Sequence, residues 1–311
     1  MIKAKNLTKK FDGFLAVDGV DLDIKRGQVQ VLLGPNGAGK TTTIRMLSSI
    51  LKPSNGYASI AGFDVLLEPE KVRRSVGVLT EHHGLYKRMK TEEYLRFFGG
   101  LYGLGKKEIN IRIQNLLEKY GLNADIEKAL GEFSKGMRQK LSLVRALLHN
   151  PPVLLFDEPT SAMDPESAFV VRTTIKDLRS EERAILICTH NLLEADELAD
   201  RVAIIQKGKI IFDSTIKNLK NGMSGESKFM ITFNNSLNGL LPELPVGIRL
   251  LEKGENSISF AIRDPLRMNP ILIRKLSNSG LNVLTFQEIV PSIEEAYLNV
   301  LNSNVGEYGA R

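Results

Sequence analysis

The sequence predicts an α/β protein with a mostly parallel central sheet, followed by a small α+β domain. Apolar, strand-like segments alternate with helical patterns from residue 29 onward, as in chains that form parallel sheets. The short continuous apolar run "VLLF" at residues 153–156 is typical of a strand buried on both faces. The composition shifts at the glycine-rich segment "NGMSGESK", which predicts a first domain over residues 1–220 and a second over 221–311.

The composition is that of an ordinary soluble globular protein, with 311 residues, 42% hydrophobic and 25% charged. No run approaches the roughly 18 apolar residues of a membrane span, and no apolar signal segment is visible, so we expect a cytosolic protein. A net charge of +6 favours an anionic partner, whether nucleotide, nucleic acid or an acidic membrane surface. The single cysteine, Cys188, lies in the apolar run "AILICTH" and is expected to be a core residue.

The first element is expected to be an antiparallel sheet. Residues 7–28, "LTKKFDGFLAVDGVDLDIKRGQ", alternate apolar and polar side chains as half-buried strands do. In one interpretation Phe11 is a core residue of this sheet. In the other its flat ring is a stacking surface for a nucleotide base.

A glycine-rich loop follows the apolar segment at residues 29–33 and precedes a helical pattern. Its sequence, "GPNGAGKT" at residues 34–41, matches G-x-x-x-x-G-K-[ST] in the strand, loop and helix context of a phosphate-binding loop, or P-loop. Glycine lacks the Cβ that would keep backbone amides away from phosphate oxygens. Lys40 is placed to reach the β- and γ-phosphates, and the Thr41 hydroxyl to ligate Mg²⁺. The predicted phosphate-binding residues are Gly34, Pro35, Asn36, Gly37, Ala38, Gly39, Lys40, Thr41 and Thr42.

Two carboxylates end the buried strand at residues 153–156. Asp157 can hold Mg²⁺ through water, and Glu158 can polarise the water that attacks a γ-phosphate. Beside a P-loop, this pair predicts hydrolysis of a nucleotide and not binding alone.

A second anion site is expected at "FSKGMRQKLS", residues 133–142, where Ser134 and Gly136 precede a helical run. Backbone N–H groups at a helix start, together with the helix dipole, bind phosphate-sized anions. Taken alone, the stretch is better explained by a serine N-cap on a surface helix, and the rest of the chain has to decide.

In this order the motifs resemble the nucleotide-binding subunit of an ATP-binding-cassette (ABC) transporter, over residues 1–220. Besides "GPNGAGKTT" and "LLFDEPT", the chain carries "SAMDP" at 161–165, where the family's D-loop falls, and "ICTH", which ends at the switch histidine, here His190. The resemblance implies a P-loop NTPase fold with a RecA-like, mostly parallel core. It also implies an antiparallel β subdomain and an inserted helical subdomain, here at about residues 82–150.

The resemblance also implies roles for several residues. It implies that Phe11 stacks on adenine, that His190 contacts the γ-phosphate, and that Asp157 and Thr41 hold Mg²⁺. Ser134, Gly136 and Asp164 would face ATP bound to a second subunit. The chain departs from the family pattern at Glu81, where a glutamine is expected, and at Lys135 and Met137 of the signature. Glu81 is still expected to ligate Mg²⁺ through a carboxylate oxygen, although it adds negative charge. The "SKGM" form is similar to that of the drug and antibiotic exporter branch.

The inserted region between residues 81 and 134 contains two amphipathic helical patterns, at 91–104 and 110–122. We expect the apolar set of the first to pack in the core: Tyr94, Leu95, Phe97, Phe98 and Leu101. Leu85, Tyr86 and Met89 are either core residues or surface contacts for a partner helix. His149, at a helix end, is expected to be exposed or to cap the helix.

The C-terminal region is predicted to form a small mixed sheet crossed by two helices, at residues 268–280 and 291–303. It carries no catalytic constellation, and we hypothesise that it regulates the protein or stabilises a dimer.

The leading functional prediction is an ATP-hydrolysing subunit of an ABC exporter, using ATP and Mg²⁺. Its expected partners are a separate transmembrane permease subunit, which would hold the chain at the inner face of the cell membrane, and a second nucleotide-binding subunit in a homodimer. No nucleic-acid partner is expected. The alternative is a soluble ABC-type ATPase acting on nucleic acid or ribosomes. One P-loop and no sustained heptads disfavour that alternative, and the intact Glu158 and His190 disfavour a non-hydrolysing sensor.

Overall fold

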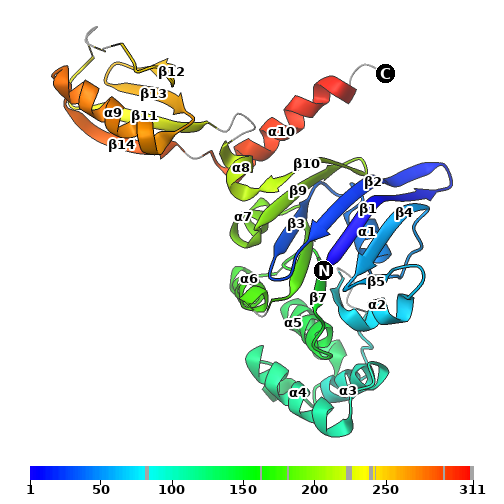
Figure 1. Ribbon diagram of the computed structural model, residues 1–311. Coiled ribbons are helices and arrows are strands. Elements are labelled where there is room, and N and C mark those ends of the chain that lie inside the picture. The colour runs from blue at the N-terminus through cyan, green and yellow to red at the C-terminus, as the bar shows by residue number, and fades with distance from the viewer. Residues whose placement is uncertain are drawn as a thin grey trace. The chain divides into compact units, whose positions relative to one another are not determined.

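The computed structural model of the chain describes residues 1–80, 84–161, 163–180, 182–221, 226–237, 241, 243–289 and 291–308. The chain divides into two compact units, Met1–Ser214 and Thr215–Arg311 (Figure 1). The boundary lies before the predicted residue 220, because helix α8 (Ile216–Asn221) packs against α10 (Ile293–Tyr308) of the second unit.

The central sheet of the first unit has the strand order β10-β9-β3-β8-β7-β6. Strand β3 pairs in parallel with β8 and β9, and β7 pairs in parallel with β6 and β8. Every residue of β3, β7 and β8 is buried, which explains their mostly apolar sequences. Because parallel strands end at the same edge, the segments after β3, β7 and β8 meet there. The strands are β3 (Val29–Leu33), β6 (Val76–Leu79), β7 (Val153–Asp157), β8 (Ala184–Thr189), β9 (Arg201–Gln206) and β10 (Lys209–Thr215).

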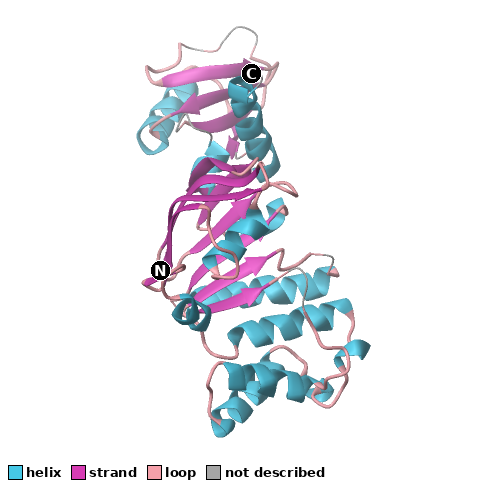
Figure 2. Ribbon diagram, turned by 90° about the vertical axis from the view of Figure 1, so that its right-hand side faces the viewer, coloured by secondary structure: helices cyan, strands magenta, loops and turns pink. Residues whose placement is uncertain are grey.

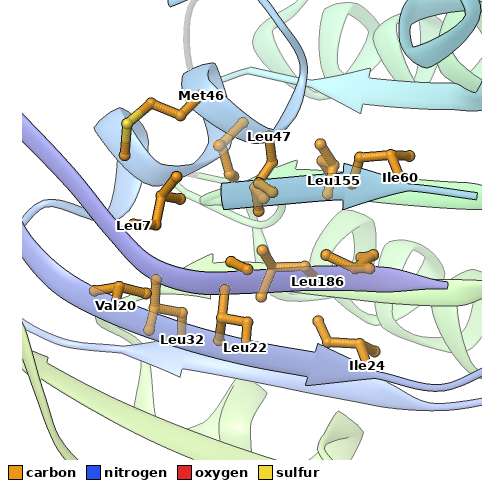
Figure 3. Close-up of a cluster of buried hydrophobic side chains, with 14 of the residues drawn as sticks. Leu7, Val20, Leu22, Ile24, Leu32, Met46, Leu47, Ile60, Leu155 and Leu186 are labelled. Atoms are coloured by element: carbon orange, nitrogen blue, oxygen red, sulfur yellow. The ribbon is translucent and has the colours of Figure 1, made fainter. Parts of the chain in front are cut away.

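A second sheet of order β2-β1-β4-β5 is antiparallel, as the alternating N-terminal sequence predicts. The hairpin between β1 and β2 turns at Asp12 and Gly13, which both have positive φ. Figure 3 shows the core formed by side chains of this sheet, including Leu22 and Ile24, together with Leu32, Leu155 and Leu186 of the central sheet. The strands are β1 (Ile2–Phe11), β2 (Phe14–Ile24), β4 (Asn55–Ile60) and β5 (Phe63–Asp64).

Helix α1 (Lys40–Leu47) contacts strands of both sheets and buries Met46 and Leu47 in their shared core. It follows β3 directly, so its first turn lies where the strands of the central sheet end. The other helices of this part are α2 (Pro69–Ser75), α6 (Pro165–Ser180) and α7 (Leu192–Leu198).

The predicted helical insertion lies beyond strand β6 at one edge of the central sheet (Figure 2). Helix α3 packs against α4, α4 against α5, and α5 against β6. Tyr94 and Leu95 are buried as expected, but Phe97 and Leu101 are 47% and 62% exposed, so the predicted apolar set divides between core and surface. The elements are α3 (Thr91–Leu101), α4 (Lys106–Lys119), α5 (Lys135–Leu147) and the 3₁₀ turns η1 (Asn123–Asp125) and η2 (Leu130–Glu132).

The second unit contains a four-stranded sheet of order β12-β13-β11-β14. All three strand pairs are antiparallel, so the prediction of a mixed sheet is wrong. Helix α9 (Pro265–Asn278) buries Leu272 and Leu276 in the core of this sheet, whereas α10 packs against α8. The strands are β11 (Ser227–Phe233), β12 (Ile248–Lys253), β13 (Ser257–Ile262) and β14 (Val283–Ile289). Among the described residues of both units, no helix is long and apolar enough to cross a membrane.

Candidate active site

The P-loop connects β3 to α1 and depends on its glycines for its shape. A Cβ on Gly34 would lie 2.3 Å from the Ile205 carbonyl oxygen, and one on Gly39 would lie 2.5 Å from that of Ala16. Gly37 and Gly39 also have φ values of 79° and 108°, which side chains disfavour. No side chain caps the start of α1, so the loop presents the N-terminal end of a helix to its surroundings. This arrangement is suited to binding phosphate.

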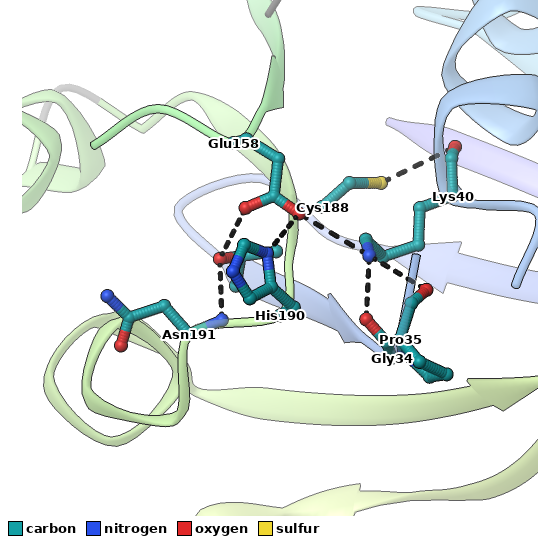
Figure 4. Close-up of polar contacts among 8 residues, drawn as sticks. Gly34, Pro35, Lys40, Glu158, Cys188, His190 and Asn191 are labelled. Atoms are coloured by element: carbon teal, nitrogen blue, oxygen red, sulfur yellow. Dashed lines mark hydrogen bonds and ion pairs between the residues drawn. The ribbon is translucent and has the colours of Figure 1, made fainter. Parts of the chain in front are cut away.

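Lys40 is buried and folds back over the loop (Figure 4). Its Nζ donates to the carbonyl oxygens of Gly34, at 2.6 Å, and Pro35, at 3.1 Å. The same Nζ lies 3.4 Å from Oε1 of Glu158. The P-loop cation and the carboxylate after β7 therefore form a buried ion pair.

Glu158 receives three side-chain partners on its two carboxylate oxygens. Oε1 lies near Lys40 and is 2.9 Å from Nδ1 of His190, while Oε2 accepts a hydrogen bond from the Thr189 hydroxyl at 3.2 Å. The Glu158 backbone N–H donates to the Cys188 carbonyl at 2.8 Å, and its φ of 51° lies in the left-handed region. A strained backbone at a site with converging charges is typical of a functional residue.

The residues predicted to hold Mg²⁺ lie at the same edge of the sheet. Asp157 is the last residue of β7 and is 2% exposed, and Thr41 is in the first turn of α1. Carboxylate and hydroxyl oxygens are ligands that Mg²⁺ prefers, so the donor set fits this ion. Among the described residues there is no cluster of three or more His, Cys, Asp or Glu side chains that could hold a metal ion. Glu81 lies outside the described residues.

A pocket of about 410 Å³ opens beside the P-loop. Phe11, at the end of β1, and Phe14, at the start of β2, form its apolar part and are 41% and 64% exposed. Phe11 is therefore not a core residue of the antiparallel sheet. Phe14 was not among the predicted site residues, although the hairpin sequence "FDGF" pairs it directly with Phe11. The remaining lining residues are Ala16, Asn36, Gly37, Gly39, Lys40, Thr41, Thr42 and Glu158.

Ser134, Gly136 and Asp164 lie near one another and do not line this pocket. The Ser134 hydroxyl caps α5 by accepting from the Met137 N–H at 3.2 Å, so the N-cap interpretation holds for the single chain. Asp164 accepts from the Ser167 N–H at the start of α6, which lowers the pKa of its carboxyl. A Cβ on Gly136 would lie 3.1 Å from the Ser167 hydroxyl, so the helix start of α5 approaches that of α6 closely.

Buried polar contacts that the sequence did not reveal connect these segments. Gln139 of α5 donates to the Pro159 carbonyl at 2.6 Å, and the Thr160 hydroxyl donates to Glu194 of α7. Burial raises the pKa of the Glu194 carboxyl. Cys188 is buried, as predicted, and burial raises the pKa of its thiol.

His149 is neither exposed nor a helix cap, contrary to expectation. Its ring is half-buried, stacks on Tyr102 with ring centroids 3.6 Å apart, and donates from Nε2 to the Val76 carbonyl at 3.0 Å. This contact joins the end of α5 to the first residue of β6.

Comparison with known proteins identifies the family. A family model described as "ABC transporter" matches residues 17–161. The ABC transporter ATP-binding protein NatA of Bacillus subtilis (strain 168) is 40% identical over 226 residues, which are 72% of this chain and 92% of the relative. The chain belongs to the ABC transporter family. The daunorubicin/doxorubicin resistance ATP-binding protein DrrA of Streptomyces peucetius is 33% identical, over 96% of this chain and 91% of its own length.

Solved structures of ABC proteins share the fold. An ATP-binding subunit of an ABC transporter matches with a TM-score of 0.67 and 29% identity, over 72% of this chain and 93% of that chain. A bacterial ABC transporter cassette solved as a dimer matches with a TM-score of 0.65 and 24% identity, over 70% and 99%. The predicted family, P-loop NTPase fold and enzyme class are thereby confirmed. The chain is an ATP-binding, ATP-hydrolysing subunit of an ABC transporter.

Proposed function

We propose that two copies of this ABC subunit bind ATP between facing surfaces, and that closure and hydrolysis drive export through separate transmembrane subunits. The convergence of Lys40, His190 and Thr189 on the Glu158 carboxylate, beside the P-loop pocket, carries this proposal. These side chains come from three segments, which end or follow strands β3, β7 and β8 and meet where the central strands end. Such an arrangement suits transfer of a phosphoryl group to water.

The resting ion pair suggests how ATP engages the site. Lys40 is held by two carbonyls and Glu158, and the triphosphate supplies stronger anionic partners for the same ammonium group. When Lys40 turns to the β- and γ-phosphates, Oε1 of Glu158 loses its cation and can accept a hydrogen bond from water. Glu158 then accepts a proton from this water as the water oxygen bonds to the γ-phosphorus, and ADP leaves as the bond between the γ-phosphorus and the bridging oxygen breaks. We propose that His190, whose side chain is 54% exposed, contacts the γ-phosphate.

Thr41 and Asp157 would hold Mg²⁺, which neutralises phosphate charge when bound. Both residues lie at the ends of elements that flank the P-loop pocket. We propose that Glu81 also contributes a ligand, on the family resemblance alone.

The signature residues would complete the site of a second copy. Ser134 is exposed at the start of α5, and the adjacent Gly136 and Lys135 add a backbone donor and a cation. Asp164 lies within reach of the same helix start. Because these residues do not line their own chain's pocket, we propose that they contact ATP bound to the partner's P-loop, in a head-to-tail homodimer.

An apolar patch on the helical insertion suits a membrane partner. Tyr86, Phe97 and Leu101 are 55%, 47% and 62% exposed, and the rings of Tyr86 and Phe97 lie 6.5 Å apart. Exposed aromatic side chains of this kind receive a partner helix. We therefore propose that this patch binds a permease subunit, which would hold the chain at the inner face of the membrane.

Relatives that match almost the whole chain support export. The daunorubicin/doxorubicin resistance protein DrrA and the linearmycin resistance ATP-binding protein LnrL of B. subtilis each match 96% of this chain, the second unit included. Their names refer to drug resistance, whereas the substrate of the present chain is set by its membrane subunit. A soluble ATPase acting on nucleic acid or ribosomes remains the second candidate.

Turnover of the Glu158→Gln variant tests the catalytic assignment. We expect kcat to fall about 10²- to 10⁴-fold with ATP binding retained, because the water loses its base. The matched control is Glu70→Gln, which neutralises an exposed glutamate of α2 and should leave turnover unchanged. Undiminished turnover in Glu158→Gln would refute the assignment.

Inverted membrane vesicles test the export assignment. When the chain is co-expressed with a candidate membrane subunit, the vesicles should accumulate a drug such as daunorubicin in the presence of ATP, and vesicles with Glu158→Gln should not. ATPase activity that responds to ribosomes or RNA and not to the membrane subunit would favour the second candidate.

A further inference from the structure

Thr189 lies at the junction of three segments of the site. It is the last residue of β8 and is completely buried. Its hydroxyl donates to Oε2 of Glu158 at 3.2 Å and accepts from the Asn191 N–H at 3.0 Å. Its backbone carbonyl accepts from the N–H of Gly34, the first residue of the P-loop, at 3.2 Å. One residue thus joins the P-loop, Glu158 and the loop that carries His190.

The direction of these hydrogen bonds gives the hydroxyl a defined task. A threonine hydroxyl has one proton, and the Asn191 N–H occupies one of its acceptor positions, so the proton is available to Glu158. Threonine is also stiff at χ1, which fixes the position of the hydroxyl oxygen, and the proton turns toward the acceptor that is in reach. Oε2 is therefore held in place, while Oε1 is the oxygen that lies beside Lys40 and His190 (Figure 4).

We infer that Thr189 is a positioning residue for hydrolysis: its hydroxyl fixes the Glu158 carboxylate so that Oε1 faces the P-loop pocket. The inference rests on the proposed role of Glu158. When ATP draws Lys40 away from Glu158, the Thr189 hydroxyl and His190 are the side-chain partners that remain on the carboxylate. Without the hydroxyl, the carboxylate can rotate away from the attacking water, and misplacement of about 1 Å costs on the order of 10²-fold in rate.

A competing role for the hydroxyl is to hold Glu194. Burial raises the pKa of the Glu194 carboxyl, and a hydrogen bond from the Thr189 hydroxyl would counteract that rise. The Thr189 hydroxyl is better directed toward Glu158, because the 3.2 Å contact meets hydrogen-bond geometry while Oε2 of Glu194 has no such partner among the described residues. An experiment must therefore show that the hydroxyl acts through Glu158.

Thr189→Val removes the hydroxyl and keeps the side-chain shape, and Thr189→Ser keeps the hydroxyl. In the full chain we expect Thr189→Val to lower kcat about 10- to 100-fold, with the Kd for ATP within about 2-fold of the original, and Thr189→Ser to recover most of the turnover. Thr174→Val, which removes another buried hydroxyl, is the matched control and should leave kcat unchanged. If Thr189→Val does not fold, the kcat values of Thr189→Ala and Thr189→Ser are compared instead. These two variants differ only by the hydroxyl, so a lower kcat in Thr189→Ala would again measure its contribution.

Combining Thr189→Val with Glu158→Gln distinguishes a role of Thr189 through Glu158 from a role through Glu194. Single-turnover hydrolysis of labelled ATP by Glu158→Gln should not slow further when Thr189→Val is added, because the residue that Thr189 positions is already inactive. An unchanged kcat in Thr189→Val, an equal loss in Thr189→Ser, or a full additional loss in the Glu158→Gln background would overturn the inference. Normal turnover by Glu158→Gln itself would instead overturn the role proposed for Glu158.

Discussion

Acid should destabilise the first unit through His149. Its Nε2 donates to the Val76 carbonyl, so in the neutral ring Nδ1 is the bare nitrogen, and this atom is buried with no hydrogen-bond partner among the described residues. Protonating Nδ1 would bury a charged N–H beside Arg112. Burial lowers the pKa of His149 to about 4, and the positive charge of Arg112 acts in the same direction. The hydrogen bond to the Val76 carbonyl acts in the opposite direction.

The sign of the effect follows from the lowered pKa. An unfolded chain binds a proton to His149 near pH 6.5, whereas the folded chain resists it until about pH 4. The stabilisation is therefore present above pH 6.5 and is lost as the pH falls toward 4. Between pH 7 and pH 5, linkage with these two pKa values gives a loss of at most about 2 kcal/mol.

Thermal unfolding of the chain without nucleotide, at pH 7 and pH 5, measures this loss. His149→Phe is the matched variant, because it keeps a ring to stack on Tyr102 but cannot be protonated. For a unit of this size, about 2 kcal/mol corresponds to roughly 4–8 °C in Tm. We expect acid to lower the Tm of the original chain by that much more than the Tm of His149→Phe. An equal acid shift in both proteins would refute this account of His149.

Three further predictions concern nucleotide binding and the second unit. Lys40→Ala should weaken ATP binding about 10- to 100-fold, because a charge-assisted contact to phosphate is lost, and calorimetry that shows an unchanged Kd would contradict this role. Phe11→Ala should weaken ATP and GTP about equally, roughly 5- to 100-fold, since stacking tolerates any base, while tripolyphosphate binding stays the same. A larger effect from Phe14→Ala would make Phe14 the stacking surface. Removing residues 215–311 should preserve ATP binding and weaken ATP-dependent dimerisation, and unchanged dimerisation would exclude a dimer-stabilising role for the second unit.

Features formed by consecutive residues could be predicted from the sequence. The P-loop, Asp157 and Glu158 depend on a local order of residues, and the apolar runs before them identified buried parallel strands. His190 was predicted as part of the same series of motifs. The fold follows largely from these segments, because parallel strands bring their C-terminal ends to one edge.

Contacts between distant residues could not be predicted in this way. Thr189 lies 31 residues from Glu158, and His149 lies 73 residues from Val76, so nothing in the local pattern reveals either pair. His149 was expected at the surface because helix ends are usually exposed, but Tyr102 and β6 cover it. The prediction of a mixed sheet in the second unit was also wrong. Alternation of apolar and polar residues specifies which face of a strand is buried, but not which strand pairs with it.

The most direct test of the account is size-exclusion chromatography of Glu158→Gln with and without ATP, repeated after Ser134→Arg. Blocked hydrolysis should leave two copies closed on ATP, so we predict a dimer that appears only with ATP. A bulky cation at Ser134, which caps α5 and is exposed in the single chain, should abolish that dimer. A monomer under all conditions, or an ATP-dependent dimer that Ser134→Arg leaves intact, would contradict the claim that this helix start closes on the partner's nucleotide.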